Sequence, residues 1–257
     1  MLMNYFIAAD TDIGIKKSTN QDGLSVKLLK KNGENMVFAV LCDGMGGLAK
    51  GELASTELIK AFDNWLENDF SGECHEQKDF EQIKSQWSCL VDAQNRKIGM
   101  YGRQSAINLG TTVVVLLLTD NGYLAMNVGD SRAYEIGTDI AQITKDQTVV
   151  AQEIEMGKLT KEEALKDSRR NVLLQCVGAS ETVVPAFYQG ATQLNHTYLL
   201  CSDGFVHEIS DNEIYEKLAP QMVNDKIALL NNIRNLIELN KSRLEQDNIS
   251  VVAVKTY

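Results

Sequence analysis

The sequence predicts an α+β fold, a four-layer α-β-β-α sandwich of two mainly antiparallel sheets with helices outside, plus a flap. The expected elements run strands, helices, strands, a polar segment, strands, helices and a last strand, without the βαβ alternation typical of a parallel sheet. Successive strands are joined by tight turns, which favours an antiparallel meander. The 257 residues contain only two prolines. We therefore expect a single domain over residues 1–257, without a linker.

Strands are expected where short apolar runs stop at turn residues. The run at residues 37–42 is apolar without alternation, which is typical of a buried strand, and Asp43 and a glycine-rich turn follow it. Hairpin turns are predicted at residues 30–35 and at Asn121-Gly122. The predicted strands are residues 4–9, 24–29, 37–42, 109–118, 124–128, 132–136, 140–144, 188–190, 197–201 and 249–255.

Helices are expected where apolar residues recur every three or four positions. Leu58, Phe62 and Leu66 follow this spacing in one segment, and Ile83 and Trp87 follow it in the next. Two long helices in succession indicate a helical layer on a sheet. The predicted helices are residues 48–68, 80–101, 146–167, 210–218 and 226–239, with residues 71–79 joining the first two.

A charged segment between two blocks of strands, residues 146–186, is the predicted flap subdomain. Its first half has a helical pattern that Gly157 interrupts, and Thr160 with Glu163 matches a capping box. Its second half is irregular. Because loops of this length in a compact domain are usually functional, we expect this flap to be mobile and to serve the site.

Composition limits the possible partners and the compartment. The formal charge of −10 argues against nucleic acid or an anionic membrane as the main partner. No apolar stretch reaches the roughly 18 residues of a membrane span, and the N-terminus lacks the pattern of a signal peptide. The five cysteines show no paired spacing and fit small core residues in a reducing compartment. We therefore expect a cytoplasmic protein, and a monomer.

Acidic residues at the ends of apolar runs are the strongest functional signal. Asp43, Asp130 and Asp203 each follow such a run, and Asp247 precedes the last one. Each alone fits a turn residue. A carboxylate at the end of a buried strand is costly unless it is paired or binds a metal. Four such residues, far apart in sequence, together predict carboxylates that converge on hard cations.

Other chemistries fit the sequence less well. The stretch from Gly44 to Ala49 has the form of a dinucleotide fingerprint, but Asp43 would repel a pyrophosphate. No cysteine has an arginine at the sixth following residue, which excludes a thiolate phosphate loop of that kind. His75, His196 and His207 show no metal-ligand spacing, and we expect surface or hydrogen-bonded side chains at each.

A set of ordered motifs resembles the metal-dependent Ser/Thr protein phosphatases of the PPM (type 2C) family, in its bacterial branch. The resemblance runs from about Asp10 to Val254, nearly the whole chain. The motifs are the loop at residues 11–22, Asp43-Gly-Met-Gly-Gly47, Gly110-Thr-Thr112, Asn127-Val-Gly-Asp-Ser-Arg132, Ile143-Thr-Lys-Asp146, Arg170-Asn-Val-Leu173, Cys201-Ser-Asp-Gly204 and Asp247-Asn-Ile-Ser250.

The resemblance implies a core site with two Mn or Mg ions. Asp43 matches the acid that bridges the two ions, and Gly44 matches the residue whose backbone carbonyl binds one of them. Asp203 and Asp247 match the remaining ligands of the first ion. The paired ions would lower the pKa of a bridging water, so that hydroxide attacks phosphorus without a protein nucleophile.

Two further acids are given roles by the same resemblance. Asp22 matches the acid that reaches the ions through water, and the catalytic residues implied by the resemblance are Asp22, Asp43 and Lys17. Asp130, with Asp203, matches the ligands of a third and weaker ion found in bacterial members.

The sequence departs from the family pattern at three positions. Lys17 stands where the family usually has an arginine that binds the substrate phosphate. Lysine keeps the charge but loses the bidentate contact, so we expect weaker phosphate binding. Gln147 and Met45 stand where histidines are usual, so the sequence offers no obvious general acid.

The predicted function is hydrolysis of phosphoserine and phosphothreonine in proteins by a metal-activated water. The predicted partners are phosphoproteins, including a cognate Ser/Thr kinase and its substrates, which implies a role in signalling. Two alternatives stay open. One is a catalytically weak pseudophosphatase that binds phosphoproteins, although Asp22, Asp43, Asp203 and Asp247 are all intact. The other is a metal-dependent hydrolase of small phosphoesters.

Overall fold

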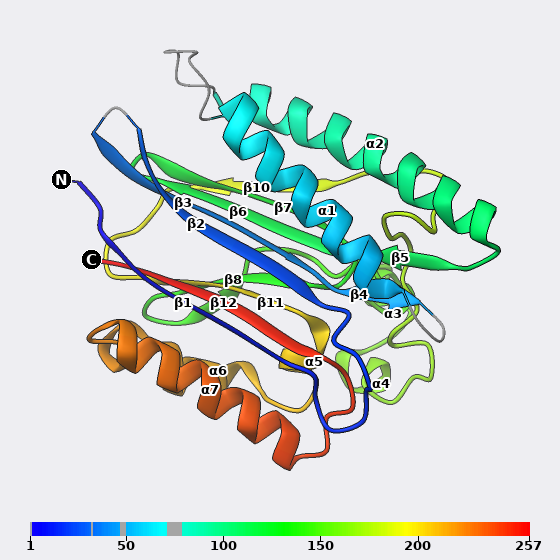
Figure 1. The fold of residues 1–257 in the computed structure, drawn as a ribbon. Helices are drawn as coiled ribbons and strands as arrows, with labels where there is room; N and C mark the ends of the chain where they lie inside the picture. The colour runs from blue at the N-terminus through cyan, green and yellow to red at the C-terminus, as the bar shows by residue number, and fades with distance from the viewer. Residues whose placement is uncertain (1, 32, 47–49, 71–78) are drawn as a thin grey trace.

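The computed structural model describes residues 2–31, 33–46, 50–70 and 79–257. It confirms the four-layer α-β-β-α sandwich (Figure 1). The first sheet has the strand order β10-β7-β6-β3-β2, and α1 and α2 cover its outer face. The second sheet has the order β1-β12-β11-β8-β9, with α6 and α7 on its outer side. Every strand pair in the two sheets is antiparallel.

The element bounds agree with most of the predicted ranges. The strands are β1 (Tyr5–Asp12), β2 (Gly23–Lys31), β3 (Glu34–Cys42), β4 (Gly44–Gly46), β5 (Leu109–Thr111), β6 (Val113–Thr119), β7 (Gly122–Val128), β8 (Arg132–Ile136), β9 (Ile140–Gln142), β10 (Ala186–Gly190), β11 (Thr197–Cys201) and β12 (Ile249–Thr256). The α-helices are α1 (Gly51–Trp65), α2 (Phe80–Ser105), α3 (Val149–Glu155), α4 (Lys161–Ala164), α5 (Asp203–Val206), α6 (Asp211–Leu218) and α7 (Lys226–Ser242). Residues 47–49 and 71–78, which include the start of the first predicted helix and most of the predicted connection, lie outside the described residues.

Strand β3 shows how the sequence builds the layers. Its residues from Met36 to Cys42 are all buried, as the unbroken apolar run predicts. Phe38 and Val40 join the core beneath α1 and α2, whereas Ala39 and Leu41 join the core between the sheets. Because successive side chains of a strand point to opposite faces, one apolar run supplies both cores.

Two predictions of local structure are wrong. The corner at residues 129–131 is not part of a meander, because β7 pairs within the first sheet and β8 within the second. The predicted strand at 109–118 is divided, because β5 pairs with β4 in a separate two-stranded sheet. The predicted interruption of the helical segment 146–167 is confirmed, since Gly157 adopts a left-handed φ of 69° between α3 and α4. The predicted capping box of Thr160 and Glu163 is present at the start of α4.

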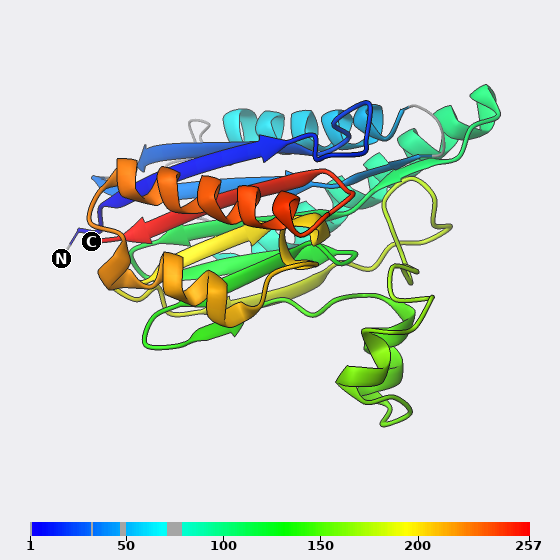
Figure 2. The same ribbon diagram turned by 90° about the horizontal axis from the view of Figure 1, so that it is seen from below.

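The segment with α3 and α4 projects from one end of the sandwich (Figure 2). Its first residues are anchored, since Arg132 donates to both carboxylate oxygens of Asp146 at 2.7–3.1 Å. Within the described parts of the chain, no helix is long and apolar enough to cross a bilayer.

Strand register in the first sheet brings three acids to this same end. Gly23 pairs with Cys42, so Asp22 directly before β2 and Asp43 directly after β3 leave the sheet side by side. Strand β7 ends beside the start of β6, which in turn lies beside the end of β3. Asp130 follows β7 and therefore lies at this end as well.

Register in the second sheet brings the other two acids there. Cys201 at the end of β11 pairs with Val251 near the start of β12. Asp203, which follows β11, and Asp247, which precedes β12, therefore lie beyond the same end of these two neighbouring strands. Strand β1 ends beside the start of β12, and the loop 13–22 then crosses to the first sheet. Antiparallel pairing thus gathers acids that are as far apart in the chain as Asp22 and Asp247, 225 residues.

One buried asparagine holds the crossing loop. The side chain of Asn248, which is 2% exposed, accepts a hydrogen bond from the backbone N–H of Gln21 at 2.9 Å. It donates to the carbonyls of Ile13 and Thr19 at 3.0 and 3.2 Å. The loop that carries Lys17 and ends at Asp22 is therefore fastened to the start of β12 at three points.

Replacing Asn248 by alanine should loosen this loop. Three hydrogen bonds would be lost and buried backbone groups left without partners, so we expect Asn248→Ala to lower the free energy of unfolding by about 2–4 kcal/mol. Urea unfolding in the presence of EDTA measures this directly. The control is Asn64→Ala at an exposed position of α1, where we expect a change within about 0.5 kcal/mol. Equal unfolding midpoints for the two variants would contradict the role given to Asn248.

Candidate metal centre

Three of the acids gathered at the end of the sandwich, Asp22, Asp43 and Asp130, have raised pKa values. The pKa of Asp43 lies well above its usual value, first because of burial and then because of the negative charges of Asp22, Asp203, Asp247 and Asp130. The carboxyl group is surrounded by protein, although the residue keeps a partly exposed edge. Every acid predicted for the site thus acts on Asp43, and the carboxylates form one electrostatic cluster.

Asp22 and Asp130 show the same effect. Burial raises the pKa of Asp22 to about 7, with the charges of Asp203 and Asp247 adding to it and nearby serine hydroxyls opposing it. Burial also raises the pKa of Asp130 to about 8, together with the charges of Asp203 and Asp146. Carboxylates that repel one another in a buried place are costly unless a cation neutralises them.

Several carboxylate oxygens of this cluster are buried without a partner. Both oxygens of Asp22 and Oδ1 of Asp203 accept no hydrogen bond of normal geometry from any residue within the described ranges. The hydroxyl of Ser250 lies close to Asp22, but it is 2.7 Å from the hydroxyl of Thr11, with which it shares a hydrogen bond. Buried oxygens with free lone pairs are the donor type that Mg²⁺ and Mn²⁺ prefer, so the residues present fit such ions.

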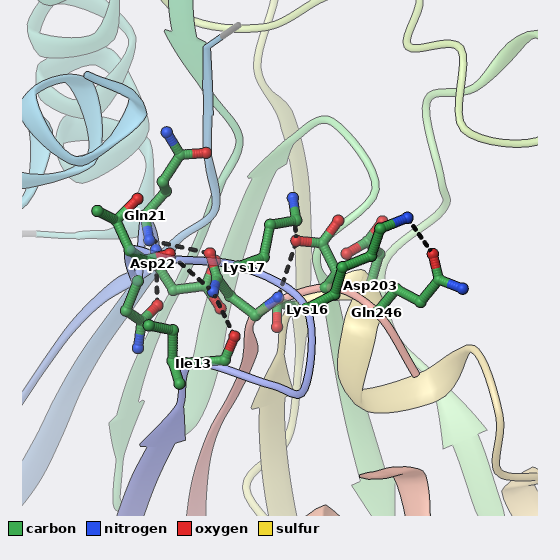
Figure 3. Close-up of polar contacts among 12 residues, drawn as sticks. Ile13, Lys16, Lys17, Gln21, Asp22, Asp203 and Gln246 are labelled. Carbon is green, nitrogen blue, oxygen red and sulfur yellow. Dashed lines mark hydrogen bonds and ion pairs between the residues drawn. The ribbon is translucent and has the colours of Figure 1, made fainter. Parts of the chain in front are cut away.

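Within the described ranges, no three His, Cys, Asp or Glu side chains already lie in ligating positions around one point. The Lys17 ammonium lies among these acids, since its Nζ is 2.8 Å from Oδ1 of Asp247. Burial disfavours this charge, but the hydrogen bond to Asp247 and the charges of Asp247, Asp43 and Asp203 outweigh that effect and raise the pKa of Lys17. Lys17 thus lies beside two of the acids predicted for the site, Asp22 and Asp203 (Figure 3).

The backbone around Asp43 is held by two threonines of the Gly110-Thr-Thr112 motif. The N–H of Asp43 donates to the hydroxyl of Thr112 at 3.1 Å. The carbonyl of Asp43 accepts from the N–H of Thr112 and from the hydroxyl of Thr111, both at 2.9 Å. The Thr112 hydroxyl is also hydrogen bonded to that of Ser131, beside Asp130, at 2.6 Å. These bonds fix the direction in which Asp43 leaves β3.

Two glycines allow the close approach of the segments that carry the acids. A Cβ on Gly44 would lie 2.4 Å from the carbonyl oxygen of Gly51 and 2.5 Å from that of Gln21. A Cβ on Gly14 would lie 2.2 Å from the carbonyl oxygen of Asp247, and Gly14 has a φ of 76°. Larger residues would push these segments apart, so the close backbone contacts require glycine at both positions.

Two residues of the site were missed by sequence reasoning. His207 was expected to be only a surface or hydrogen-bonded residue, yet its Nε2 lies 3.4 Å from Oδ2 of Asp203 and its Nδ1 lies 3.3 Å from Oε2 of Glu245. The other oxygen of Glu245 accepts from the backbone N–H groups of Gln246 and Asp247 at 2.7 and 2.8 Å. His207 and Glu245 therefore connect the segments of Asp203 and Asp247.

A sequence signal for His207 existed in its spacing. It lies four residues after Asp203, and residues four apart meet on one face of a helix. Burial opposes the charged form, but Glu245 and Asp203 outweigh this and raise the pKa of His207 to about 9. Glu245 had no comparable signal, because its contacts are set by the tertiary fold.

Gln147, which stands where the resemblance leads one to expect a histidine, has a structural role. Its Oε1 accepts from the N–H of Gly129 and from Nε2 of Gln175, both at 2.8 Å. It therefore ties the corner before Asp130 to the projecting segment. An amide in this place cannot transfer a proton at neutral pH.

Comparison with known proteins agrees with this geometry. The sequence profile of the family described as Protein phosphatase 2C matches residues 15–229. The chain is 29% identical over 250 residues to protein phosphatase PhpP of Streptococcus pneumoniae serotype 2, covering 95% of this chain and 94% of the relative. It is 28% identical to serine/threonine phosphatase stp of Listeria monocytogenes serotype 4b, covering 95% of this chain and 93% of the relative.

Solved structures of bacterial phosphatases have the same fold. The S. agalactiae serine/threonine phosphatase matches with a TM-score of 0.85 and 25% identity, covering 98% of this chain and 99% of the other. The catalytic domain of the serine threonine protein phosphatase PstP, in complex with two manganese ions, matches with a TM-score of 0.80 and 26% identity over 99% of both chains. The ordered motifs, the sandwich and these matches agree: the chain belongs to the protein phosphatase 2C family, in its bacterial branch.

Proposed function

We propose that this chain hydrolyses phosphoserine and phosphothreonine in proteins, with two Mn or Mg ions in the acid cluster. The observation that carries this proposal is the set of mutually repelling carboxylates at one end of the sandwich, some with buried oxygens that have no partner. Such ions, when bound, lower the pKa of water enough to supply a nucleophile near neutral pH. Family membership supports a phosphoprotein as the substrate.

The ligand roles in this proposal follow the positions of the acids. Asp43, acted on by all four other acids, suits the bridging ligand, and the Gly44 carbonyl follows it directly. Asp203 and Asp247 lie beyond the same end of β11 and β12, and they would be the remaining ligands of one ion. Asp22 would orient water through its free oxygens.

Two further roles complete the proposal. Asp130, whose pKa is raised in part by Asp203, would share a third and weaker ion with that residue. Lys17 would bind the substrate phosphate, since its ammonium already lies among the acids and would turn to an incoming anion. The 38% exposed side chain of Lys17 is accessible to such a ligand.

The wider setting is part of the same proposal. The chain would act in the cytoplasm, as a monomer, on phosphoproteins that include a cognate Ser/Thr kinase and its substrates. Residues 146–186 would form the flap subdomain of a single domain over 1–257. The projection of α3 and α4 beyond the sandwich, at the end where the acids gather, supports a role in substrate contact (Figure 2).

Activity should depend on divalent ions and on the acids. We expect turnover of p-nitrophenyl phosphate and of a phosphothreonine peptide with Mn²⁺ and none with EDTA. Asp203→Asn should lower turnover at least about 100-fold. Mutation of a residue that only hydrogen bonds to a metal ligand typically lowers metal affinity or activity 10- to 100-fold, and loss of a ligand itself should cost more. Asp139→Asn, on the exposed β8–β9 turn, is the matched control and should leave turnover unchanged. Metal binding by the wild type without turnover of either substrate would indicate a pseudophosphatase, and turnover of the small ester alone would indicate a small-molecule hydrolase.

The metal-free protein should lose stability as the pH rises from about 5 to 8. With pKa values of about 7 and 8 in the folded state against 3.8 for an ordinary aspartate, Asp22 and Asp130 keep protons that the unfolded chain has released. The folded state then binds more protons, so the free energy of unfolding falls with pH in this window. Melting temperatures in EDTA at several pH values measure the slope.

Mn²⁺ should reverse this loss, and its stabilising effect should grow with pH because binding releases protons. Asp22→Asn should raise the stability of the metal-free protein at pH 8 by about 1–3 kcal/mol, since it removes a buried charge without a partner. A melting temperature in EDTA that stays constant or rises between pH 5 and 8 would show that these carboxyls are not protonated in the folded state.

Lys17→Arg should improve phosphate binding. An arginine offers a planar pair of donors that matches two phosphate oxygens, whereas the lysine ammonium acts as a point charge. We expect a lower KM with little change in kcat, and a higher KM for Lys17→Ala. Steady-state kinetics with a phosphopeptide test this, and an unchanged or higher KM for Lys17→Arg would contradict it.

A further inference from the structure

A pocket of about 560 Å³ opens beside the acid cluster. Four segments line it: the loop after β1 (residues 16–18), the projecting segment (Arg170 and Asn171), the end of α5 (His207 and Glu208) and the turn before β12 (residues 244–247). Lys17 and Asp247 belong both to this pocket and to the acid cluster, so the two spaces adjoin. We call this space the flank pocket.

Two cations of the flank pocket are not neutralised by a carboxylate. The Lys16 ammonium donates at 2.7 Å to Oε1 of Gln246, which is a neutral amide (Figure 3). The Arg170 guanidinium makes no ion pair with any residue that the structure describes. Its neighbour Arg169, in contrast, pairs with Glu153 and Asp167. Arg170 is close enough to His207 to oppose the charge of that ring, so the guanidinium belongs to the pocket electrostatically as well.

Two of the three acids that line the pocket already have charged partners. Asp247 pairs with Lys17 at 2.8 Å. Glu245 lies 3.3 Å from His207 and accepts two backbone hydrogen bonds. Glu208 makes no ion pair with any residue that the structure describes, and only its backbone carbonyl accepts a hydrogen bond from Arg243, at 2.7 Å. The charges of Lys16 and Arg170 together exceed the single charge of Glu208, which leaves a local excess of positive charge on a chain whose formal charge is −10. An anion near the site is drawn to this place, whereas the net charge of the molecule repels it.

We propose that the flank pocket binds an anionic side chain of the substrate, a carboxylate or a second phosphate, close in sequence to the phosphorylated residue. This rests on the proposed function. Lys17 and Lys16 are adjacent in the chain, one beside the acids and the other in the flank pocket. Because the flank pocket adjoins the acid cluster and a peptide residue spans at most about 3.3–3.6 Å, we expect the anionic group within about three residues of the phosphorylated one. In an extended peptide, the residue two positions away projects to the same side.

The test compares phosphothreonine peptides that differ in one flanking residue. The panel carries alanine, lysine, glutamate or a non-hydrolysable phosphonate analogue of phosphoserine at each position within three residues of the phosphothreonine. With Mn²⁺, we expect kcat/KM for at least one anionic peptide to exceed that of the alanine peptide about three- to tenfold, the range of two partly exposed charge contacts. This preference should fall with added salt. The glutamate and phosphonate arms tell which anion binds more tightly.

Charge reversal separates recognition from a structural effect. We expect the double variant Lys16→Glu/Arg170→Glu to prefer the lysine peptide over the glutamate peptide. The matched control is Lys158→Glu/Lys166→Glu, which makes the same change of charge at two exposed positions of the projecting segment outside the pocket. That control should keep the wild-type preference. Circular dichroism and thermal melting check that both double variants fold.

The outcomes distinguish the two proposals. Hydrolysis of all peptides at equal rates by the wild type, or an equal loss of preference in both double variants, would overturn the role of the flank pocket and leave the phosphatase function intact. Hydrolysis of none of the peptides, despite bound Mn²⁺, would overturn the proposed function and this inference with it.

Discussion

Repulsion among the five acids at one end of the sandwich is the constraint on which the site depends. Asp43 experiences the charges of Asp22, Asp130, Asp203 and Asp247 at once, and burial adds to the effect. A chain of this size is stable by only about 5–15 kcal/mol, so such a cluster is a large local cost. The fold therefore has to hold the acids in place against their own repulsion. It does so with strand register, the Asn248 hydrogen bonds, the threonines around Asp43 and the close contacts of Gly14 and Gly44.

The layers and most elements could be predicted because they depend on local periodicity. The apolar run before Asp43 and the spacing of apolar residues in the two long helices are visible in any short window of sequence. The corner at residues 129–131 could not be assigned in this way. A turn between two strands looks the same whether the strands pair or lie in different sheets, and only long-range packing decides between them.

The acids of the site were predictable, and the residues that support them were not. An acid next to a buried apolar run is conspicuous in the sequence, because a charged side chain is costly at such a position unless it is paired or binds a metal. His207 and Glu245 lie in ordinary polar segments, and their role arises only when β11 and β12 pair and bring their segments together. Gln147 shows the same limit, since its contacts with Gly129 and Gln175 depend on how the projecting segment folds back.

The structure separates the residues suited to chemistry from those suited to recognition. The acids lie at the ends of buried strands in both sheets, where hydrogen bonds and close backbone contacts restrict them. Lys16 lies on the loop after β1 and Arg170 lies on the projecting segment. Both residues are exposed, and neither forms an ion pair with an acid among the described residues. Substitutions at these two positions would disturb no ion pair among the residues that the structure describes, whereas substitutions among the acids would change the charge balance of the whole cluster. The proposed selectivity for a flanking charge would therefore be free to change between relatives while the acid cluster stays the same.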